Sequence, residues 1–581
     1  MINVVNVSTK EKIEKNTISS IKKQVIGRKS CYTKTRTDNK GGSRVGNFEG
    51  FSELSAFLEC SNNSTPTVRT LKKYVDILSA FGYTQLYLGL TCGYKMEGEP
   101  YFGFCRGGYD TEQLQEIDAY AAGKGIELRI NIQVLGHIGI IMRHNCYTGL
   151  FDTGDAFMVG KEEVYQLVDK MLATISKGVR SRIIHIGMDE IYDLGQGRYL
   201  QEHGYVDKRT LFLEHLQRVV ELAKKYEYTC EIWSDMFYHM VQGSEHGDNG
   251  VLPADVRSSI PEGVRIVHWR YDKQTDEVLA RQLKEHQAIS DSVTFAGCAW
   301  KSLGLAPDNK YSIWVMEHQM RICRQEGVDR YMVTMWSDGG AHCSNFAVLP
   351  SLFAAAEMAR GKTSDEIDKV AFKEIVGVDF DDFMLLDNLN NPFMKDIKTL
   401  NCRCYWGLLT DLFLGSHDLL LDAHTNEAYA ALEAKYAAVD GGDYGMIFEN
   451  HRLYSRVLSI KMNLGVQIRK AYREKNHDLL KQYAIVDIPK LIEYMKEFIT
   501  HYQKWWLSEN MAYGLEVHHL FYGGQLTRWQ YEAERLLQYL EDGQPIEELE
   551  REDLPPSIIP PTDEDRCFEM NYHYLISNCG F

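Results

Sequence analysis

The chain has 581 residues, of which 44% are hydrophobic and 25% charged, with a net charge of −17. The length allows more than one domain with a large core, while the acidic balance argues against nucleic acid or an anionic membrane as the main partner. The 13 cysteines show no repeated spacing, and neither a membrane span nor a secretory signal is visible, so we expect free thiols in a cytoplasmic protein.

Residues 1–45 differ from the rest of the chain. They contain eleven Lys or Arg, three acidic residues and few large apolar side chains. Such a composition is typical of a small appendage or of a segment that builds no core of its own. We therefore treat 1–45 as a separate basic segment and assign it no function.

Strand and helix patterns alternate regularly through residues 46–362. The expected strands are short apolar runs. Strand one ends at Leu58–Cys60, and the other seven span Thr84–Leu90, Glu127–Val134, Ile183–Glu190, Thr229–Ser234, Arg265–Trp269, Val293–Trp300 and Tyr331–Trp336. Two expected helices begin at Thr67 and at either Asp110 or Thr111. Five more span Lys161–Lys177, Lys208–Tyr226, Asp276–Ala288, Ser312–Gln325 and Phe346–Arg360. Eight strands are the number that closes a parallel (β/α)8 TIM barrel, so this α/β fold is our prediction and a doubly wound open sheet is the alternative.

From residue 363 to 581 the strand pattern stops and long helical periodicities replace it. The clearest are Tyr444–Lys475, His477–Trp506 and Gln525–Leu540. We expect a mainly helical C-terminal domain, which either braces the barrel or forms the surface of a homodimer. The acidic, Pro-containing stretch 543–565 predicts an extended connection, and the aromatic residues 568–581 are expected to dock back onto the body.

Two adjacent acids, Asp189 and Glu190, end the fourth strand. A charge is unfavourable at the end of an apolar strand unless the chain has left the core. Functional residues of parallel barrels follow the C-terminal ends of the strands, so we expect this pair at the mouth of the barrel. A solvated turn or a helix N-cap is the ordinary alternative for such a pair.

Four of the nine tryptophans follow strands five to eight, at Trp233, Trp269, Trp300 and Trp336. One tryptophan at such a place is commonly a packing residue, but four at one rim predict an apolar box around the carboxylates. Such a box suits the apolar face of a sugar ring. Asp235 and Asp338 would either accept hydrogen bonds from sugar hydroxyls or cap the helices that follow.

His137 follows strand three, and we expect it in the site rather than in the core. His185 and Asp189 belong to strand four, and with His137 they show no metal-ligand spacing such as HxxE. We therefore expect no metal ion and no other cofactor.

The stretch His185-Ile-Gly-Met-Asp-Glu190 resembles the strand-four motif His-x-Gly-x-Asp-Glu of the family 20 glycoside hydrolases, the β-N-acetylhexosaminidases. Further stretches are similar to the intracellular bacterial branch of that family, which includes the animal hexosaminidase D type. They are Tyr94–Tyr109, Trp336–Ala341 and Tyr513–Val517, followed by Gly523, Gly524 and Arg528. The resemblance covers nearly everything from Phe48 onward.

This resemblance implies removal of a terminal β-linked N-acetylhexosamine from an oligosaccharide or glycoconjugate, with retention of configuration. The substrate's own 2-acetamido oxygen would attack the anomeric carbon, an exception to the usual pair of catalytic carboxylates. Glu190 would be the general acid and then the base, with a raised pKa, while Asp189 stays ionised and accepts the acetamide N–H. Tyr271 is the candidate donor to the acetamide carbonyl.

Three positions depart from the family pattern. Asn62 stands where an arginine is usual, Cys92 where an acid is usual, and His342 where a glutamate is usual. All three positions normally contact the non-reducing sugar. We therefore expect a changed hydroxyl preference, such as GalNAc or a sugar substituted at position 6, with His342 near an anionic group.

Two alternatives stay open at this point. One is a sugar-binding relative that has lost turnover, which the Asn62 departure favours. The other is a different barrel glycosidase with two separated carboxylates, for which Glu231 or Asp235 on strand five would be the second acid.

Overall fold

The computed structural model describes residues 48–247, 252–253, 255–393, 400, 402–415, 418 and 421–551. The basic segment 1–45, the end of the expected connection 543–565 and the stretch 568–581 lie outside the described residues. All described residues belong to one compact unit.

Eight parallel strands close into a barrel in the order β1 to β8. Their bounds are β1 Glu53–Glu59, β2 Gln85–Gly89, β3 Glu127–Asn131, β4 Ile183–His185, β5 Thr229–Trp233, β6 Arg265–Trp269, β7 Val293–Cys298 and β8 Arg330–Met335. The last strand pairs with the first from Glu53↔Arg330 to Leu58↔Met335, which excludes the open sheet. The predicted TIM barrel is confirmed.

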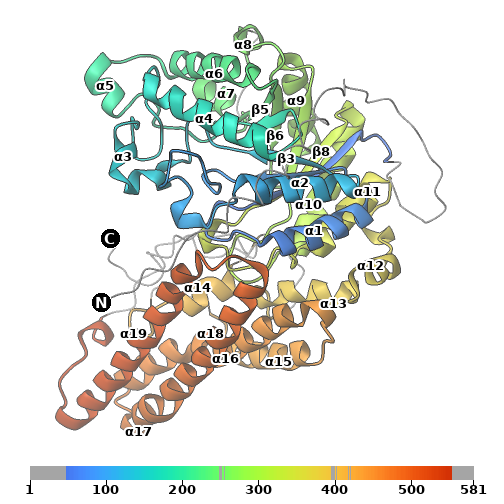
Figure 1. The fold of residues 1–581 in the computed structure, drawn as a ribbon. Coiled ribbons are helices and arrows are strands. Elements are labelled where there is room, and N and C mark those ends of the chain that lie inside the picture. The colour runs from blue at the N-terminus through green and yellow to red at the C-terminus, as the bar shows by residue number, and fades with distance from the viewer. Residues whose placement is uncertain are drawn as a thin grey trace, which may run out of the picture. The chain divides into compact units, whose positions relative to one another are not determined.

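Helices surround the strands on the outside of the barrel (Figure 1). The long ones are α1 Val68–Phe81, α2 Thr111–Gly123, α4 Glu162–Gly178, α6 Lys208–Lys224, α9 Asp276–Ile289, α10 Asn309–Glu326 and α11 Leu349–Ala359. The short ones are α3 Asn145–Thr148, α5 Arg198–His203, α7 Asp235–Gln242 and α8 Asp255–Ser259. Periodicity does not reveal α7 and α8, the helices after β5, because so few residues hardly sample one helical period.

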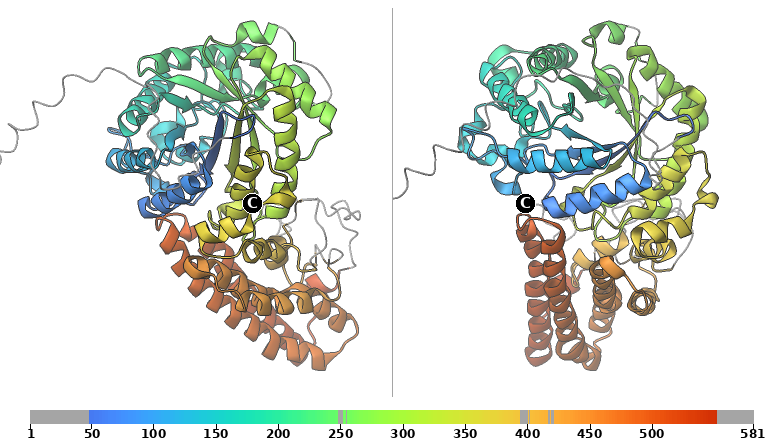
Figure 2. Two further views of the ribbon diagram at one scale, coloured as in Figure 1. Left: turned by 90° about the vertical axis from the view of Figure 1, so that its right-hand side faces the viewer. Right: turned by 45° about the vertical axis from the view of Figure 1, so that its right-hand side comes forward.

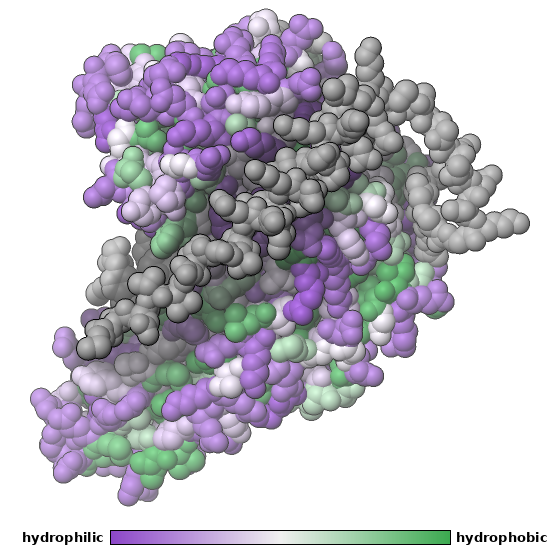
Figure 3. All heavy atoms as spheres, in the orientation of Figure 1, coloured by the Kyte–Doolittle hydropathy of each residue, from purple (hydrophilic) through white to green (hydrophobic). Residues whose placement is uncertain are grey.

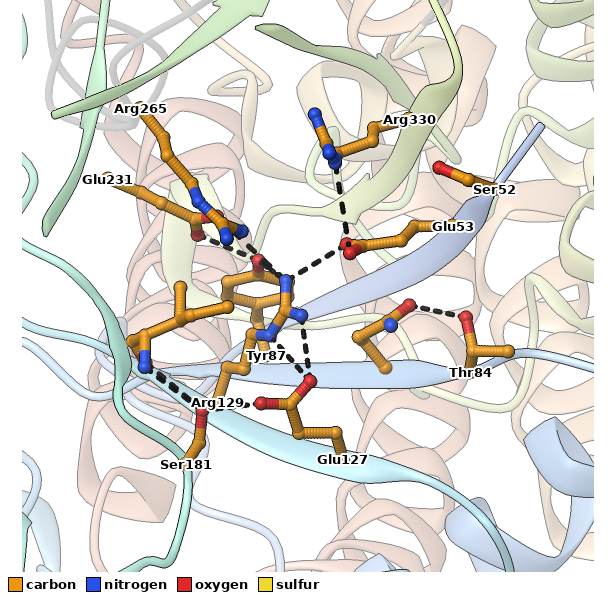
Figure 4. Close-up of polar contacts among 12 residues, drawn as sticks. Ser52, Glu53, Thr84, Tyr87, Glu127, Arg129, Ser181, Glu231, Arg265 and Arg330 are labelled. Atoms are coloured by element: carbon orange, nitrogen blue, oxygen red, sulfur yellow. Dashed lines mark hydrogen bonds and ion pairs between the residues drawn. The ribbon is translucent and has the colours of Figure 1, made fainter. Parts of the chain in front are cut away.

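The inside of the barrel is filled in layers, because side chains of a strand alternate between its two faces. Near the N-terminal ends, the guanidinium of Arg129 contacts the carboxylates of Glu53 and Glu127 at 3.1 and 2.7 Å and donates to the Tyr87 hydroxyl at 2.7 Å (Figure 4). The next layer is a separate apolar cluster made of Phe57, Tyr87, Trp233, Val267, Ala296 and Met332. The polar and apolar layers fill the floor, so open space is left only toward the C-terminal mouth.

The remaining described chain is helical, as predicted. Its helices are α12 Lys369–Val376, α13 Phe380–Met384, α14 Arg403–Leu409, α15 Thr425–Ala437, α16 Gly445–Arg473, α17 His477–Gln482, α18 Ile488–Glu509 and α19 Leu515–Asp542. Helix α16 packs against α15 and α18, and α18 packs against α19 (Figure 2). The one helix expected over His477–Trp506 is two, separated by a π-helical turn at Tyr483–Asp487. Pro489 lies in the first turn of α18, directly after this π-helical turn.

Helix α19 begins ten residues before the expected Gln525 and continues through Gly523 and Gly524. Each glycine costs a helix about 1 kcal/mol relative to alanine, which favours a later start. The buried ring of Phe521 lies in this first part of the helix, and burying such a side chain is worth about 1.5–3 kcal/mol. Tertiary packing therefore extends the helix beyond its local preference.

The helical region, here called the helical domain, is bound to the barrel at the end of α18. The carboxylate of Glu509 accepts hydrogen bonds from the Ser344 hydroxyl at 2.8 and 3.0 Å and from the Trp505 indole at 2.7 Å. The Met511 amide donates to the Thr65 carbonyl at 2.8 Å. One continuous apolar core includes residues of both parts, such as Leu54 of the barrel and Trp529 of the helical domain.

Hydrophilic residues cover most of the surface over α4 and α6 (Figure 3). Among the helices of the described ranges, none is long and apolar enough to cross a bilayer.

Candidate active site

A cavity of about 1150 Å³ opens at the C-terminal ends of the strands. Eleven of the thirteen expected site residues line it: Asn62, Cys92, His137, Asp189, Glu190, Trp233, Trp269, Tyr271, Trp300, Trp336 and Asp338. The two that do not are Asp235 and His342. The barrel thus brings together side chains from all eight strand ends.

The loop after β4 holds the acidic pair in an uncommon backbone conformation. The φ angles of Gly187, Met188 and Glu190 are +70°, +69° and +54°. Positive φ is unfavourable for residues other than glycine, and it persists where surrounding contacts enforce it. Contacts from β3 and β5 enforce it here.

Gln133 makes the contact from the β3 side. Its amide nitrogen donates to Asp189 Oδ1 at 3.0 Å, and its amide oxygen accepts from the Met188 N–H at 3.2 Å. A Cβ atom on Gly187 would lie 1.9 Å from that oxygen, so only glycine fits. Sequence reasoning missed Gln133, although a polar residue between Ile132 and Val134 at the end of an inward-facing strand was a usable signal.

Asp235 makes the contact from the β5 side. Its Oδ2 accepts the Glu190 N–H at 2.8 Å, and its Oδ1 accepts the Trp269 indole N–H at 3.4 Å. The residue is 1% exposed, and burial together with the charge of Asp189 raises the pKa of Asp235 well above its ordinary value. Asp235 therefore lies behind the cavity wall, and the expectation that it meets sugar hydroxyls or caps α7 is corrected.

His137 lies between the two acids. Its Nε2 is 3.4 Å from Asp189 Oδ2 and 3.3 Å from Glu190 Oε2, and its backbone N–H donates to Asp155 at 2.8 Å. Burial alone would lower the pKa of His137, but the two carboxylates outweigh it and raise the pKa to about 11. The imidazolium in turn holds the pKa of Asp189 below its ordinary value, against the effect of burial. Asp189 is thus kept ionised.

The same three side chains could also hold a metal ion, since their ligand atoms lie within 4.8 Å of one another. A metal binds only the deprotonated imidazole, whereas His137 is charged between the two acids. The absence of a metal requirement stays a prediction.

Aromatic rings form a continuous wall around Tyr271. Its ring stacks on Trp269 at 5.0 Å between centroids and meets Trp300 and Trp336 edge to face at 6.0 and 6.4 Å. Trp233, which is 1% exposed, forms the floor, and its ring centroid lies 5.9 Å from that of Trp336. Burial raises the pKa of Tyr271 well above its ordinary value, so the hydroxyl keeps its proton.

The wall opposite the acidic pair comes from β1, β2 and β8. The Asn62 amide donates to Asp338 Oδ1 at 3.2 Å, and Glu59 accepts the Ser337 N–H at 2.6 Å. Arg106 also lines the cavity and donates to the Asn63 side chain at 3.3 Å. Glu59 and Arg106 were not expected from the sequence. The only indication of a cation on this wall was the family resemblance, which places an arginine at position 62.

His342 turns away from the cavity, because Ala341 before it has a φ of +58°. It is 3% exposed, and its Nδ1 lies 2.7 Å from the Tyr522 hydroxyl of α19. Burial lowers the pKa of His342 to about 3, so the ring is neutral. The expectation that His342 meets an anionic substituent of the sugar is therefore wrong.

Glu231 lies in the polar layer below the cavity and not on its wall. It is 1% exposed and accepts the Tyr87 hydroxyl at 2.7 Å, while Arg129 lies 3.8 Å away (Figure 4). It cannot reach a substrate in the cavity. Neither acid considered for a second catalytic position, Glu231 or Asp235, is placed to serve there.

Two family models match the chain. Residues 66–296 match the glycosyl hydrolase family 20 catalytic domain, and residues 381–567 match the Glycoside Hydrolase 20C C-terminal domain. The first match covers the strand ends that line the cavity from β2 to β6, and the second covers most of the helical domain.

The chain is also similar to curated relatives and to solved structures. Hexosaminidase D of Bos taurus is 23% identical over 267 residues, which is 44% of this chain and 73% of that protein. Hexosaminidase D of Homo sapiens is 24% identical over 223 residues, 36% of this chain and 43% of that protein. The GH20 β-N-acetylhexosaminidase of Streptomyces coelicolor A3(2) has a TM-score of 0.41 at 18% identity, covering 57% of this chain and 70% of that one. The β-N-acetylhexosaminidase of Bacteroides fragilis NCTC 9343 has a TM-score of 0.42 at 19% identity, covering 52% and 65%.

Proposed function

Because the chain belongs to glycoside hydrolase family 20 and carries that family's catalytic domain, we propose that it releases terminal β-linked N-acetylhexosamine, GlcNAc or GalNAc, from oligosaccharides or glycoconjugates. The proposed mechanism retains configuration and uses the 2-acetamido oxygen of the substrate as the nucleophile. One observation carries the proposal: Asp189 and Glu190 share His137 inside a single cavity walled by indoles.

Glu190 is the proton donor to the leaving oxygen and then the base that activates water. Its side chain is 38% exposed, so both a leaving group and a water molecule can reach it. Asp235 fixes the backbone of Glu190, and His137 limits the directions in which its carboxyl group can point. A positioned acid of this kind contributes about 10²- to 10⁴-fold to the rate.

Asp189 accepts the acetamide N–H and stabilises the positive charge of the oxazolinium-like intermediate. Gln133 and His137 each occupy one of its oxygens, but each carboxylate oxygen has two lone pairs and can accept another hydrogen bond. A fixed anion that is held ionised before the reaction stabilises developing positive charge without reorganising.

Tyr271 is the proposed donor to the acetamide oxygen, and the surrounding indoles take the methyl group and the apolar face of the ring. On the opposite wall, Asn62, Asp338 and the cavity-lining Arg106 are the candidates for the sugar hydroxyls, with Cys92 beside them. Arg106 would supply the cation that the family resemblance places at position 62.

The mutation that tests the assignment is Glu190→Gln. We expect it to abolish hydrolysis of oligosaccharides, whose leaving groups need protonation, and to reduce hydrolysis of aryl β-GlcNAc less. Asp189→Ala should lose several kcal/mol of transition-state stabilisation on both substrates, because a fixed charge disappears. Glu245→Gln is the matched control, since Glu245 lines the same cavity but lies outside the pair. Wild-type rates of both pair variants on the aryl glycoside would refute the assignment.

A thiazoline analogue of GlcNAc distinguishes the mechanism from that of a glycosidase with two separated carboxylates. The analogue resembles the cyclised intermediate, so it should inhibit far more strongly than GlcNAc itself. Inhibition no stronger than that by GlcNAc would favour direct attack by a carboxylate.

A further inference from the structure

The helical domain contributes part of the cavity wall. Cys402 and Tyr405, at the beginning of α14, and Val517 and Phe521 of α19 all line the cavity together with the strand ends. A barrel alone would leave this part of the rim open.

These residues contact the loop after β8. The Tyr405 hydroxyl donates to the Gly339 carbonyl at 3.4 Å. The ring edge of Phe521 lies so close to Gly340 that a Cβ atom there would be 3.2 Å from it. The helical residues therefore extend the β8 wall.

His342 holds this wall together. Its ring centroid lies 5.2 Å from that of Tyr405 and 5.1 Å from that of Phe521. Its Nδ1 is 2.7 Å from the Tyr522 hydroxyl, one residue after Phe521. The departure from the family pattern at this position thus acts through the helical domain and not through a charge on the substrate.

The position of the wall defines which part of the substrate it meets. In a closed barrel of eight strands, β8 lies four strands from β4 in either direction, so the wall faces Asp189 and Glu190 across the cavity. The anomeric carbon must be at Glu190 for proton transfer to the leaving oxygen. In a pyranose ring C-4 lies directly across from C-1, so C-4 and its hydroxyl point toward the β8 wall.

We propose that Tyr405 and Phe521 of the helical domain form the far wall of the sugar site and determine its selectivity at C-4, with His342 as the residue that positions them. This inference rests on the proposed function, because it needs the anomeric carbon at Glu190. Aromatic edges and faces suit the C–H groups of a sugar and exclude an axial or substituted oxygen. The wall also closes the cavity beyond C-4, which limits the enzyme to chain ends.

The test compares 4-nitrophenyl β-GlcNAc with its GalNAc counterpart, which differ only in the C-4 configuration. The variants are Phe521→Ala, Tyr405→Ala and, as the matched control, Leu520→Ala, whose side chain is next to Phe521 but 75% exposed. We expect both wall variants to raise KM and to change the GlcNAc-to-GalNAc ratio of kcat/KM by about tenfold, the usual scale of pocket discrimination, while kcat changes little. Leu520→Ala should leave the ratio unchanged.

Phe521→Leu and Tyr405→Phe keep most of the apolar volume and provide the answer if an alanine variant does not fold. An unchanged ratio in folded wall variants that still turn over, or an equal change in Leu520→Ala, overturns the inference while the proposed function stands. A wild-type enzyme that hydrolyses neither epimer overturns the proposed function itself, and this inference with it.

Discussion

At the scale of single residues, the acidic pair depends on hydrogen bonds to two neighbouring side chains. Asp189 and Glu190 lie in a loop with three positive φ angles, a conformation that costs about 1–3 kcal/mol at each such residue other than glycine. Gln133 and Asp235 supply the hydrogen bonds that hold it. Gln133 holds the side chain of Asp189, and Asp235 holds the backbone of Glu190.

Gln133→Met should slow catalysis, because it removes the hydrogen bond that holds the Asp189 carboxylate. A hydrogen bond to a charged group contributes about 1.5–3 kcal/mol, so we expect kcat/KM to fall by roughly ten- to a hundredfold. Gln319→Met is the matched control, because Gln319 is also buried and doubly hydrogen-bonded but lies outside the cavity lining. A Gln133→Met enzyme with wild-type kcat/KM would show that Asp189 needs no such support.

At the scale of elements, the end of α18 and the loop after β8 meet at one buried carboxyl group. Burial raises the pKa of Glu509 to about 7, although hydrogen bonds from Ser344 and Trp505 oppose this rise. Because the carboxyl is harder to ionise in the folded chain than in the unfolded chain, ionisation weakens the contact. The contact between barrel and helical domain is therefore more stable in acid than in base.

Glu509 therefore makes the free energy of unfolding larger in acid than in base. The contribution of Glu509 is fully present below its unfolded pKa of about 4.5 and is lost as the pH rises through about 7, a change of roughly 3 kcal/mol. Glu509→Gln keeps a neutral side chain at every pH. We expect its melting temperature, measured by calorimetry, to exceed the wild-type value more at pH 8 than at pH 5. An equal difference at the two pH values would contradict this reading.

At the scale of the whole molecule, the barrel and the helical domain share one apolar core and one cavity. Leu54 of β1 and Trp529 of α19 belong to the same buried cluster, and a backbone hydrogen bond joins Met511 to Thr65. Unfolding either part alone would expose the apolar surface of the other to water. The two parts should therefore unfold together, although chains of this length often unfold domain by domain.

Two signals that report on different features of the folded chain test whether its two parts unfold together. Near-ultraviolet circular dichroism reports on the packed aromatic rings of both parts, such as Trp233 in the barrel and Trp505 and Trp529 in the helical domain, and far-ultraviolet circular dichroism reports on the helices. We expect the two signals to change at the same urea concentration. Midpoints that differ beyond error would mean that the chain does not unfold in a single transition.

The sequence by itself determined the features that depend on local pattern. Apolar runs and helical periodicities predicted eight strands and the closed barrel, and the motif around Asp189 and Glu190 with the tryptophans after strands five to eight predicted the rim of the cavity. Alternation along a strand and the shared edge of parallel strands are enough for this, because both follow from backbone geometry.

Only the tertiary structure decided the direction of individual side chains beyond the strands. Asp235 lies behind the wall because Glu190 and Trp269 offer it two N–H donors, and His342 leaves the cavity because a positive φ at Ala341 turns the chain toward α19. The same packing brings Tyr405 and Phe521 into the cavity from far along the chain. Such placements depend on contacts between residues distant in sequence, and no local period encodes them.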